Sequence, residues 1–169
     1  MKKNSVLINS VRFITLLLAQ VFVFNNIDFM GYLNPYPYVL FILVFPFNAN
    51  RSLYLCIAFL TGLTLDMFGN SGGMHAAACL FIAYFRPIAL RLTFGVSYEY
   101  NAIKLPNVSF YERLVYISSL VFVHHLILFS LEVFNISSIL YILKKTLFTG
   151  IFTSILCLIF NIIFSSRQE

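Results

Sequence analysis

Long apolar stretches separated by short polar connections dominate the hydrophobic pattern of this chain. Six such stretches can be distinguished, and at the ~20 residues that one helical crossing of a bilayer needs they account for most of the sequence. The pattern predicts an all-α, polytopic integral membrane protein with about six transmembrane helices in one domain, residues 1–169. The expected spans cover residues 5–24, 37–47, 53–68, 74–93, 113–134 and 141–164.

The second stretch is too short for an ordinary crossing. Its sequence is "PYVLFILVFPF", residues 37–47, and at ~1.5 Å rise per residue it falls well short of a ~30 Å hydrocarbon core. We expect it either to start earlier with a kink or to form a short, partly re-entrant segment. Neighbouring helices must then shield it, because lipid does not tolerate unpaired backbone groups.

Composition and charge support a membrane protein and argue against other classes. Hydrophobic residues make up 60% of the chain and charged residues 10%, against roughly 25% charged in a soluble domain. The net charge of +5 is dispersed at helix ends and forms no dense basic stripe, so nucleic acid is not an expected partner. Cys56, Cys79 and Cys157 lie in apolar runs without metal-ligand spacing, and we predict neither a metal site nor a cofactor.

The distribution of Lys and Arg predicts the orientation. The basic N-terminus followed by an apolar run resembles a secretory signal, but no small-x-small cleavage site follows, and we interpret it as a retained first helix. The outer side then holds only Lys144 and Lys145, which can snorkel to the interface. The inner side collects Lys2, Lys3, Arg12, Arg51, Arg86, Arg91, Lys104, Arg113 and Arg167.

This bias places both termini in the cytoplasm. The longest polar connection, residues 95–113, then lies inside the cell and mixes tyrosines with charges. An interfacial aromatic belt is the simpler interpretation of this loop, and a docking site for a cytoplasmic partner is the alternative.

The stretch "DMFGNSGGMHAAACLFIAYFRP", residues 66–87, concentrates polar groups in the apolar sequence. Asp66 follows Gly62 by four residues, so the two share a helix face, and a carboxylate near hydrocarbon needs a donor. His75 is the nearest donor in sequence, across a short turn. We therefore predict an antiparallel hairpin in which Asp66 and His75 hydrogen-bond or contact a common partner near the outer surface. The residues expected to allow close packing or partner binding there are Gly62, Gly69, Gly72, Gly73 and Ala76. We expect the small faces of the two helices to leave a groove into which another helix can pack.

"GNSG", residues 69–72, has the G-x-S-G form of the rhomboid intramembrane proteases. Ser71 would be the nucleophile and His124 or His125 the base. Ser71 falls in an outer turn, however, and the sequence around the histidines lacks the small residues that a close contact would need. We therefore predict no catalytic residues.

Two further patterns involve polar residues in apolar helices. Arg86 and Pro87 lie near the inner end of the fourth span and favour an exit into the cytoplasm, where arginines meet headgroup phosphates; a contact between Arg86 and a partner is the alternative. In the fifth span Tyr111, Ser118, His125 and Glu132 recur every seven residues and predict a polar stripe. His125 and Glu132 are roughly 10 Å apart along such a helix, too far for a common metal, so helix-to-helix hydrogen bonding is expected.

Three segments together resemble MreD, a family of rod shape-determining membrane proteins, in its Bacteroidetes-type form. They are "NNIDFMGYLNPYPYVLFILVFPF", "GLTLDMFGNSGGMHAAACLFIAYFRP" and "VFVHHLILFSLEVF". The most specific part is the core G-x-x-x-D-x-x-x-x-x-x-G-x-H-A, matched by Gly62, Asp66, Gly73, His75 and Ala76, and the pair Arg86-Pro87 matches the exit motif.

The resemblance implies a non-enzymatic scaffold in the bacterial inner membrane that maintains rod cell shape. It would bind MreC and, with it, the assembly of MreB, RodA and a penicillin-binding transpeptidase that organises peptidoglycan synthesis. The family is similar in fold to the vitamin-binding subunits of energy-coupling-factor transporters. The alternative function is therefore a small-molecule or lipid binding or transport subunit, with a solvent-reachable cavity lined by Asp66 and His75.

Overall fold

The protein is described here by a computed structural model, which covers residues 2–27, 33–46, 49–95 and 108–165. Regular structure within these ranges is helical. The long helices are α1 (Lys2–Phe22), α3 (Arg51–Gly69), α4 (Met74–Phe94), α6 (Phe110–Val133) and α7 (Ile139–Ser165). The shorter elements are η1 (Phe24–Asn26), α2 (Val39–Val44) and η3 (Ile136–Ser138). Residues 96–107, most of the loop expected at the inner surface, lie outside the described residues, as do Lys104 and Arg167.

Four helices are long and apolar enough to cross a membrane. They are α3, α4, α6 and the segment from Ile136 to Phe164 that contains α7. The prediction of an all-helical membrane protein is confirmed at this level. The apolar part of the first helical region is shorter and covers Phe13–Asn26, and α2 has six residues where the sequence predicted a span over 37–47.

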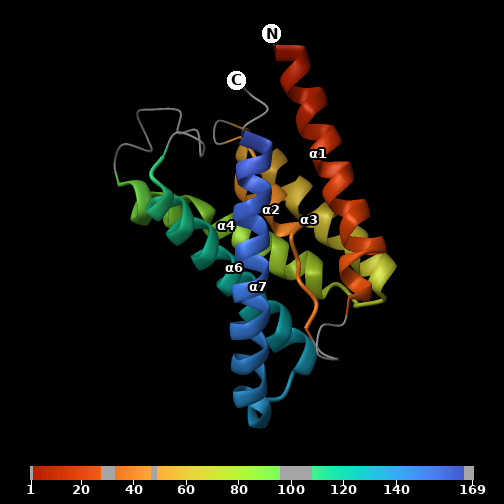
Figure 1. The fold of residues 1–169 in the computed structure, drawn as a ribbon. Helices are drawn as coiled ribbons and strands as arrows, with labels where there is room; N and C mark the ends of the chain where they lie inside the picture. Colours follow the sequence, from red (N-terminus) through yellow and green to blue (C-terminus); the bar gives the residue numbers. More distant parts are fainter. Residues whose placement is uncertain (1, 28–32, 47–48, 96–107, 166–169) are drawn as a thin grey trace.

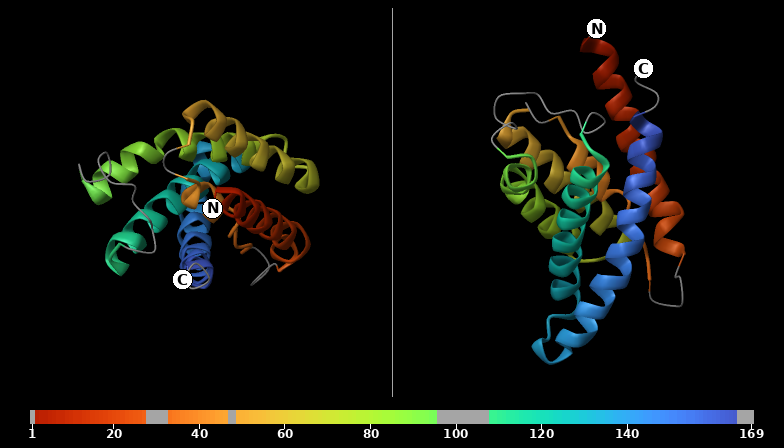
Figure 2. Two further views of the ribbon diagram at one scale, coloured as in Figure 1. Left: turned by 90° about the horizontal axis from the view of Figure 1, so that it is seen from above. Right: turned by 60° about the vertical axis from the view of Figure 1, so that its left-hand side comes forward.

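α6 and α7 run side by side toward one end of the molecule, and α4 runs obliquely across it (Figure 1 and Figure 2). The first turn of α1 and the last turn of α7 lie at one end, and the connection between α6 and α7 lies at the other (Figure 1). Seen from above, α2 lies near the middle of the molecule, with the longer helices arranged around it (Figure 2). The short second segment is therefore the centre of the fold.

Proline explains why α2 is short and how the chain around it fits inside a membrane protein. Phe45 precedes Pro46 and has left the helical region, with φ −54° and ψ 143°, as expected for a residue before proline. Pro35 and Pro37 precede the helix and have no backbone N–H, so two donors that would need partners are absent. The six helical residues rise only ~9 Å.

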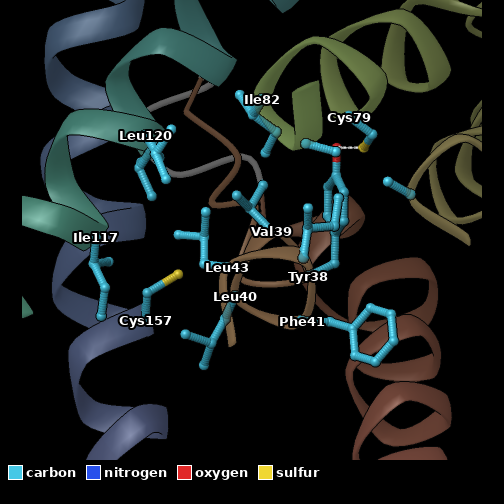
Figure 3. Close-up of a cluster of buried hydrophobic side chains, with 14 of the residues drawn as sticks. Tyr38, Val39, Leu40, Phe41, Leu43, Cys79, Ile82, Ile117, Leu120 and Cys157 are labelled. Atoms are coloured by element: carbon cyan, nitrogen blue, oxygen red, sulfur yellow. Dashed lines mark hydrogen bonds between the residues drawn. The ribbon is translucent and has the colours of Figure 1, made fainter. Parts of the chain in front are cut away.

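The side chains of α2 form the core of the bundle. Consecutive residues from Tyr38 to Leu43 are buried, although only four in seven positions of a surface helix would be apolar. Phe41 packs against Phe13 of α1 with ring centroids 4.3 Å apart. On the other sides lie Ile82 of α4, Ile117 of α6 and Cys157 of α7 (Figure 3). A helix that is apolar all round lies either in a protein core or in lipid, and the burial of Val39 to Leu43 shows that protein surrounds α2.

Three side chains from three different helices bind the carbonyl groups at the end of α2. The hydroxyl of Tyr54 in α3 donates to the Ile42 carbonyl at 3.0 Å. The hydroxyl of Tyr116 in α6 donates to the Leu43 carbonyl at 2.9 Å. Arg86 of α4 donates through Nη2 to the carbonyl of residue 45. The last carbonyls of a helix have no intrahelical partner, and these donors supply one.

Arg86 also connects the other two donors. Its Nε donates to the Tyr116 hydroxyl at 3.0 Å, and its guanidinium carbon lies 4.9 Å from the centroid of the Tyr54 ring. The side chain is 4% exposed and points into the bundle. The expectation that Arg86 meets headgroup phosphates is therefore wrong, because its side chain is buried and faces the end of α2 and Tyr116 of α6.

The segment before α2 is held in the same way from the remaining helices. Gln20 of α1 donates to the Pro35 carbonyl at 3.1 Å. The backbone N–H of Tyr36 donates to the Thr153 hydroxyl of α7 at 3.0 Å. Every long helix thus contributes a polar side chain to the backbone of residues 35–45. We call this set of contacts the α2 cradle: Gln20, Tyr54, Arg86, Tyr116 and Thr153.

Replacing Arg86 by Met tests the α2 cradle. The change keeps a long apolar stem but leaves the Phe45 carbonyl and the Tyr116 hydroxyl without this donor, and a buried group without its partner costs about 1–3 kcal/mol. We expect a lower thermal unfolding midpoint for the protein purified in detergent. Lys144→Met, which removes an exposed cation, should leave the midpoint unchanged. An Arg86→Met midpoint equal to that of this control would contradict the role of Arg86.

Candidate functional site

Asp66 caps the beginning of α4 from the end of α3. Its Oδ1 accepts from the backbone N–H of His75 at 3.0 Å, and its Oδ2 accepts from that of Ala76 at 2.8 Å. These are the second and third N–H groups of a helix whose N-cap residue, Gly73, has no side chain. Asp66 therefore supplies the capping acceptor that the N-cap lacks, and its charge lies at the positive end of the helix dipole.

The turn between the two helices needs residues that tolerate positive φ. Asn70 ends α3 at φ 50°, and Gly72 and Gly73 follow at φ 62° and 92°. Glycine adopts these values without steric cost, and asparagine is the side chain that tolerates them best. Ser71 completes the turn by donating from Oγ to Asp66 Oδ1 at 2.5 Å. Both Asp66 oxygens are thereby used within the hairpin.

Gly62 lets α3 and α4 touch through their backbones. A Cβ atom at this position would lie 2.5 Å from Ala76 Cα and would also meet the His75 carbonyl oxygen. Gly62 and Ala76 therefore form the contact between α3 and α4 and leave no space there for a third helix. Gly69, in contrast, is exposed and contributes no such contact.

The His75 side chain points to Tyr38 and not to Asp66. Its Nδ1 lies 2.9 Å from the Tyr38 hydroxyl, which also lies 2.9 Å from His124 Nε2. Cys79 donates to the same hydroxyl at 3.7 Å (Figure 3). The predicted contact between Asp66 and His75 thus exists through the backbone N–H of His75, and its ring reaches α6 through Tyr38. We call Tyr38, His75, Cys79 and His124 the Tyr38 cluster.

His125 joins α6 to α7 beside this cluster. Its Nδ1 lies 2.8 Å from the Val121 carbonyl, so Nδ1 carries a proton, and its Nε2 lies 3.2 Å from the Thr153 hydroxyl. Thr153 in turn accepts from the Tyr36 backbone. His125 is fully buried, as a residue of the predicted polar stripe should be.

The other residues of the predicted polar stripe are not buried as His125 is. Glu132 binds Lys145 of α7, whose Nζ lies 2.8 Å from both carboxylate oxygens and 4.5 Å from the centroid of the Phe129 ring. Tyr111 is 74% exposed, and Ser118 is partly buried. A seven-residue repeat drifts ~20° per step around a straight helix, so the first and last members face different surroundings.

The candidate protease pair is not assembled. Ser71 donates to Asp66, His124 faces Tyr38, and His125 faces Thr153. Within the described part of the chain, no group of three or more His, Cys, Asp or Glu residues is arranged to hold a metal ion. The chemistry that these polar side chains display is hydrogen bonding between helices.

A groove on the surface lies between α1 and α3. It has a volume of about 140 Å³ and an apolar lining. The lining includes Ile14, Leu17, Leu18 and Phe22 from α1 and Thr64 and Phe68 from α3. We call it the α1–α3 groove. Asp66 is 4% exposed and faces α4, away from a position where it could line this groove.

Sequence reasoning missed the residues at the centre of both polar groups. Tyr38, Tyr54 and Tyr116 resemble ordinary aromatic residues of an apolar run, and His124 was considered only as a possible base. The signal available in the sequence was the interrupted helix itself, because a break between Pro37 and Pro46 demands donors from neighbouring helices. Which helices supply them depends on their rotation, which one sequence does not fix.

Comparison with protein-family models, with curated protein sequences and with solved structures finds no match for this chain.

Gly62→Ala tests the backbone contact in the hairpin. The added Cβ would overlap Ala76, and overpacking of this kind costs about 1–3 kcal/mol. We expect a lower unfolding midpoint in detergent. At Gly69 a Cβ would meet only the Ser71 hydroxyl, at 3.6 Å, and Gly69→Ala should be neutral or stabilising by roughly 0.5–1 kcal/mol, as for glycine in a helix. Equal midpoints for the two variants would count against the close contact.

Proposed function

We propose that this chain is a non-enzymatic scaffold of the bacterial cell-elongation machinery, a member of the MreD type that binds MreC in the inner membrane. The sequence support is the core motif with Gly62, Asp66, Gly73, His75 and Ala76. In the structure these five residues build one tight hairpin, in which a carboxylate caps the following helix. The motif therefore stabilises the fold of the chain itself, as expected of a protein that acts as a scaffold.

The use of polar groups supports a scaffold. Asp66, Arg86 and His125 are buried and each binds another part of the bundle, and the exposed Glu132 is paired with Lys145 of α7. Large apolar side chains remain exposed on α1, α3 and α7, where they face lipid or the transmembrane helix of a partner. A protein of this kind recognises partners by packing, as transmembrane helices do.

The observation that carries the proposal is the apolar α1–α3 groove. We place one apolar side chain of the MreC transmembrane helix in it, with the rest of that helix packed on the exposed apolar side chains of α1 and α3. The larger MreB, RodA and transpeptidase assembly would be recruited through MreC. The lining of the groove comes from α1 and α3 and is apolar. A transmembrane helix is the partner to which such a surface is complementary.

The orientation and the number of spans belong to the same proposal. Six passes result if α1 and the segment containing α2 each count as one, and both termini then lie on one side, as the backbone arrangement in Figure 1 allows. The excess of Lys and Arg near that side makes it the cytoplasm.

A carrier for a small molecule or lipid is the second candidate. The observation in its favour is α2 itself, because interrupted helices at membrane depth form the binding sites of many transporters. Here, however, Tyr54, Tyr116 and Arg86 already occupy the carbonyl groups at the end of α2. The carboxylate of Asp66 is likewise used within the hairpin.

Photo-crosslinking in native membranes tests the proposed groove. A photoreactive amino acid at Leu18, in the groove, should crosslink to MreC. The same residue at Ile155, an exposed position of α7 outside the groove lining, is the matched control and should give little or no such product. Crosslinking to MreC from Ile155 alone would relocate the interface.

Mass spectrometry of the purified complex decides between the two functions. A scaffold should retain MreC, identified by its peptides, in mild detergent. A stoichiometric small molecule or lipid in the absence of MreC would contradict the scaffold and favour the carrier.

A further inference from the structure

The hydroxyl of Tyr38 lies between two imidazole rings. It is 2.9 Å from His75 Nδ1 and 2.9 Å from His124 Nε2, and Tyr38 itself is fully buried. A tyrosine hydroxyl has one proton and two acceptor lone pairs, and Cys79 donates to one of these lone pairs at 3.7 Å. The hydroxyl therefore donates to one of the two ring nitrogens and accepts from the other. The proton positions on the two rings are therefore not independent.

With both rings neutral, two arrangements satisfy this geometry. In the first, Tyr38 donates to His75 Nδ1 and accepts from a proton on His124 Nε2. In the second, His75 Nδ1 carries the proton and donates to Tyr38, and Tyr38 donates to His124 Nε2. A neutral imidazole has one N–H, so His124 carries its proton on Nε2 in the first arrangement and on Nδ1 in the second.

The surroundings of His124 distinguish the two arrangements. Its Nδ1 is buried and has no hydrogen-bond partner in the described structure. The second arrangement places an N–H there, and unpaired buried N–H groups are rarer than unpaired acceptors in proteins. The first arrangement, with a bare Nδ1, is therefore the stable one for neutral rings.

When His75 is protonated, only the second arrangement of hydrogen bonds is possible. Both nitrogens of an imidazolium are donors, so His75 Nδ1 must donate to Tyr38, and Tyr38 must donate to His124 Nε2. His124 then carries its proton on Nδ1. The balance is one proton gained by the cluster from water, with His75 becoming a cation and His124 remaining neutral in the other tautomer.

Of the two rings, His75 is the one that lies nearer to solvent. It is the second residue of α4, next to the hairpin turn, and it is only partly buried, whereas His124 is fully buried. The ionisable groups that face it are Asp66 from α3, Tyr36 and Tyr38 from the segment before α2, and residues of α6. The α6 groups are His124, His125 and Glu132, and Glu132 is paired with Lys145 of α7.

We propose that the Tyr38 cluster is a proton-binding site that couples the hairpin turn to the core: uptake of one proton by His75 reverses the Tyr38 hydrogen bond and switches the tautomer of His124. The site connects α4, the start of α2 and α6. It therefore gives one face of the membrane a means of acting on the centre of the fold. This inference uses contacts within the chain and does not depend on MreC.

Nitrogen NMR of the histidine rings measures the tautomers directly. The chain has three histidines, so a protein labelled with ¹⁵N only in histidine gives a simple spectrum, which His75→Gln and His124→Gln assign. The titration runs on the full chain in detergent from pH 8 down to about 4, which covers the ordinary histidine range and the lower pH at which a partly buried imidazole gains its proton. His125, whose Nδ1 faces the Val121 carbonyl, is the internal control, and its tautomer should not change.

As His75 becomes protonated, we expect most of His124 to pass from the Nε2–H to the Nδ1–H form with the same midpoint. In Tyr38→Phe, which lacks the bridging oxygen, His75 should still titrate while His124 keeps one tautomer. If that variant does not fold, His75→Gln serves instead and should abolish the change at His124. A His124 tautomer that stays constant in the natural protein, or that still switches in the variant, would overturn the proposal.

Discussion

An interrupted helix inside a membrane protein leaves backbone groups that lipid cannot satisfy, and this constraint organises the whole molecule. Residues 35–45 lie at the centre of the bundle, and α2 covers only part of them. The carbonyl and amide groups that have no partner within the helix are bound by the α2 cradle, to which each long helix contributes. Because a buried group without a partner costs free energy, displacing any one of these helices would leave part of the segment unsatisfied. The position of α2 and the packing of the long helices therefore depend on each other.

The Tyr38 cluster lies at the start of α2, and the cradle residues Tyr54, Arg86 and Tyr116 bind its end. Tyr38 directly precedes the helix and reaches α4 and α6 through His75 and His124. Arg86 reaches its other end from α4 and contacts α6 through Tyr116. Both ends of α2 are thus bound to the same two helices, so a change in hydrogen bonding at one end acts on an element that is held at the other. The apolar surface of α1 and α3, in contrast, remains outside this network and available to a partner.

The sequence predicted best what depends on neighbouring residues. The hairpin could be anticipated because Asp66, the glycines and His75 lie within one short stretch, and the turn restricts where they can go. The sequence also shows that the second segment is too short to cross a bilayer as one helix, because Pro46 ends the helix. The sequence predicts the position of Arg86 along α4 but not the direction of its side chain, and the expected place at the membrane surface was wrong for that reason. His124 and Tyr116 were missed for the same reason: their partners lie on distant helices, and helix rotation decides which side chains meet.

Hydrogen–deuterium exchange of the backbone amides in a lipid nanodisc tests the central claim most directly. An isolated helix of six residues is not stable in water, so protection of α2 has to come from the surrounding helices. The structure predicts that amides within Val39–Val44 exchange as slowly as those in the middle of α4. Exchange of these amides as fast as that of the first turn of α1 would contradict a buried α2 held in place by its neighbours.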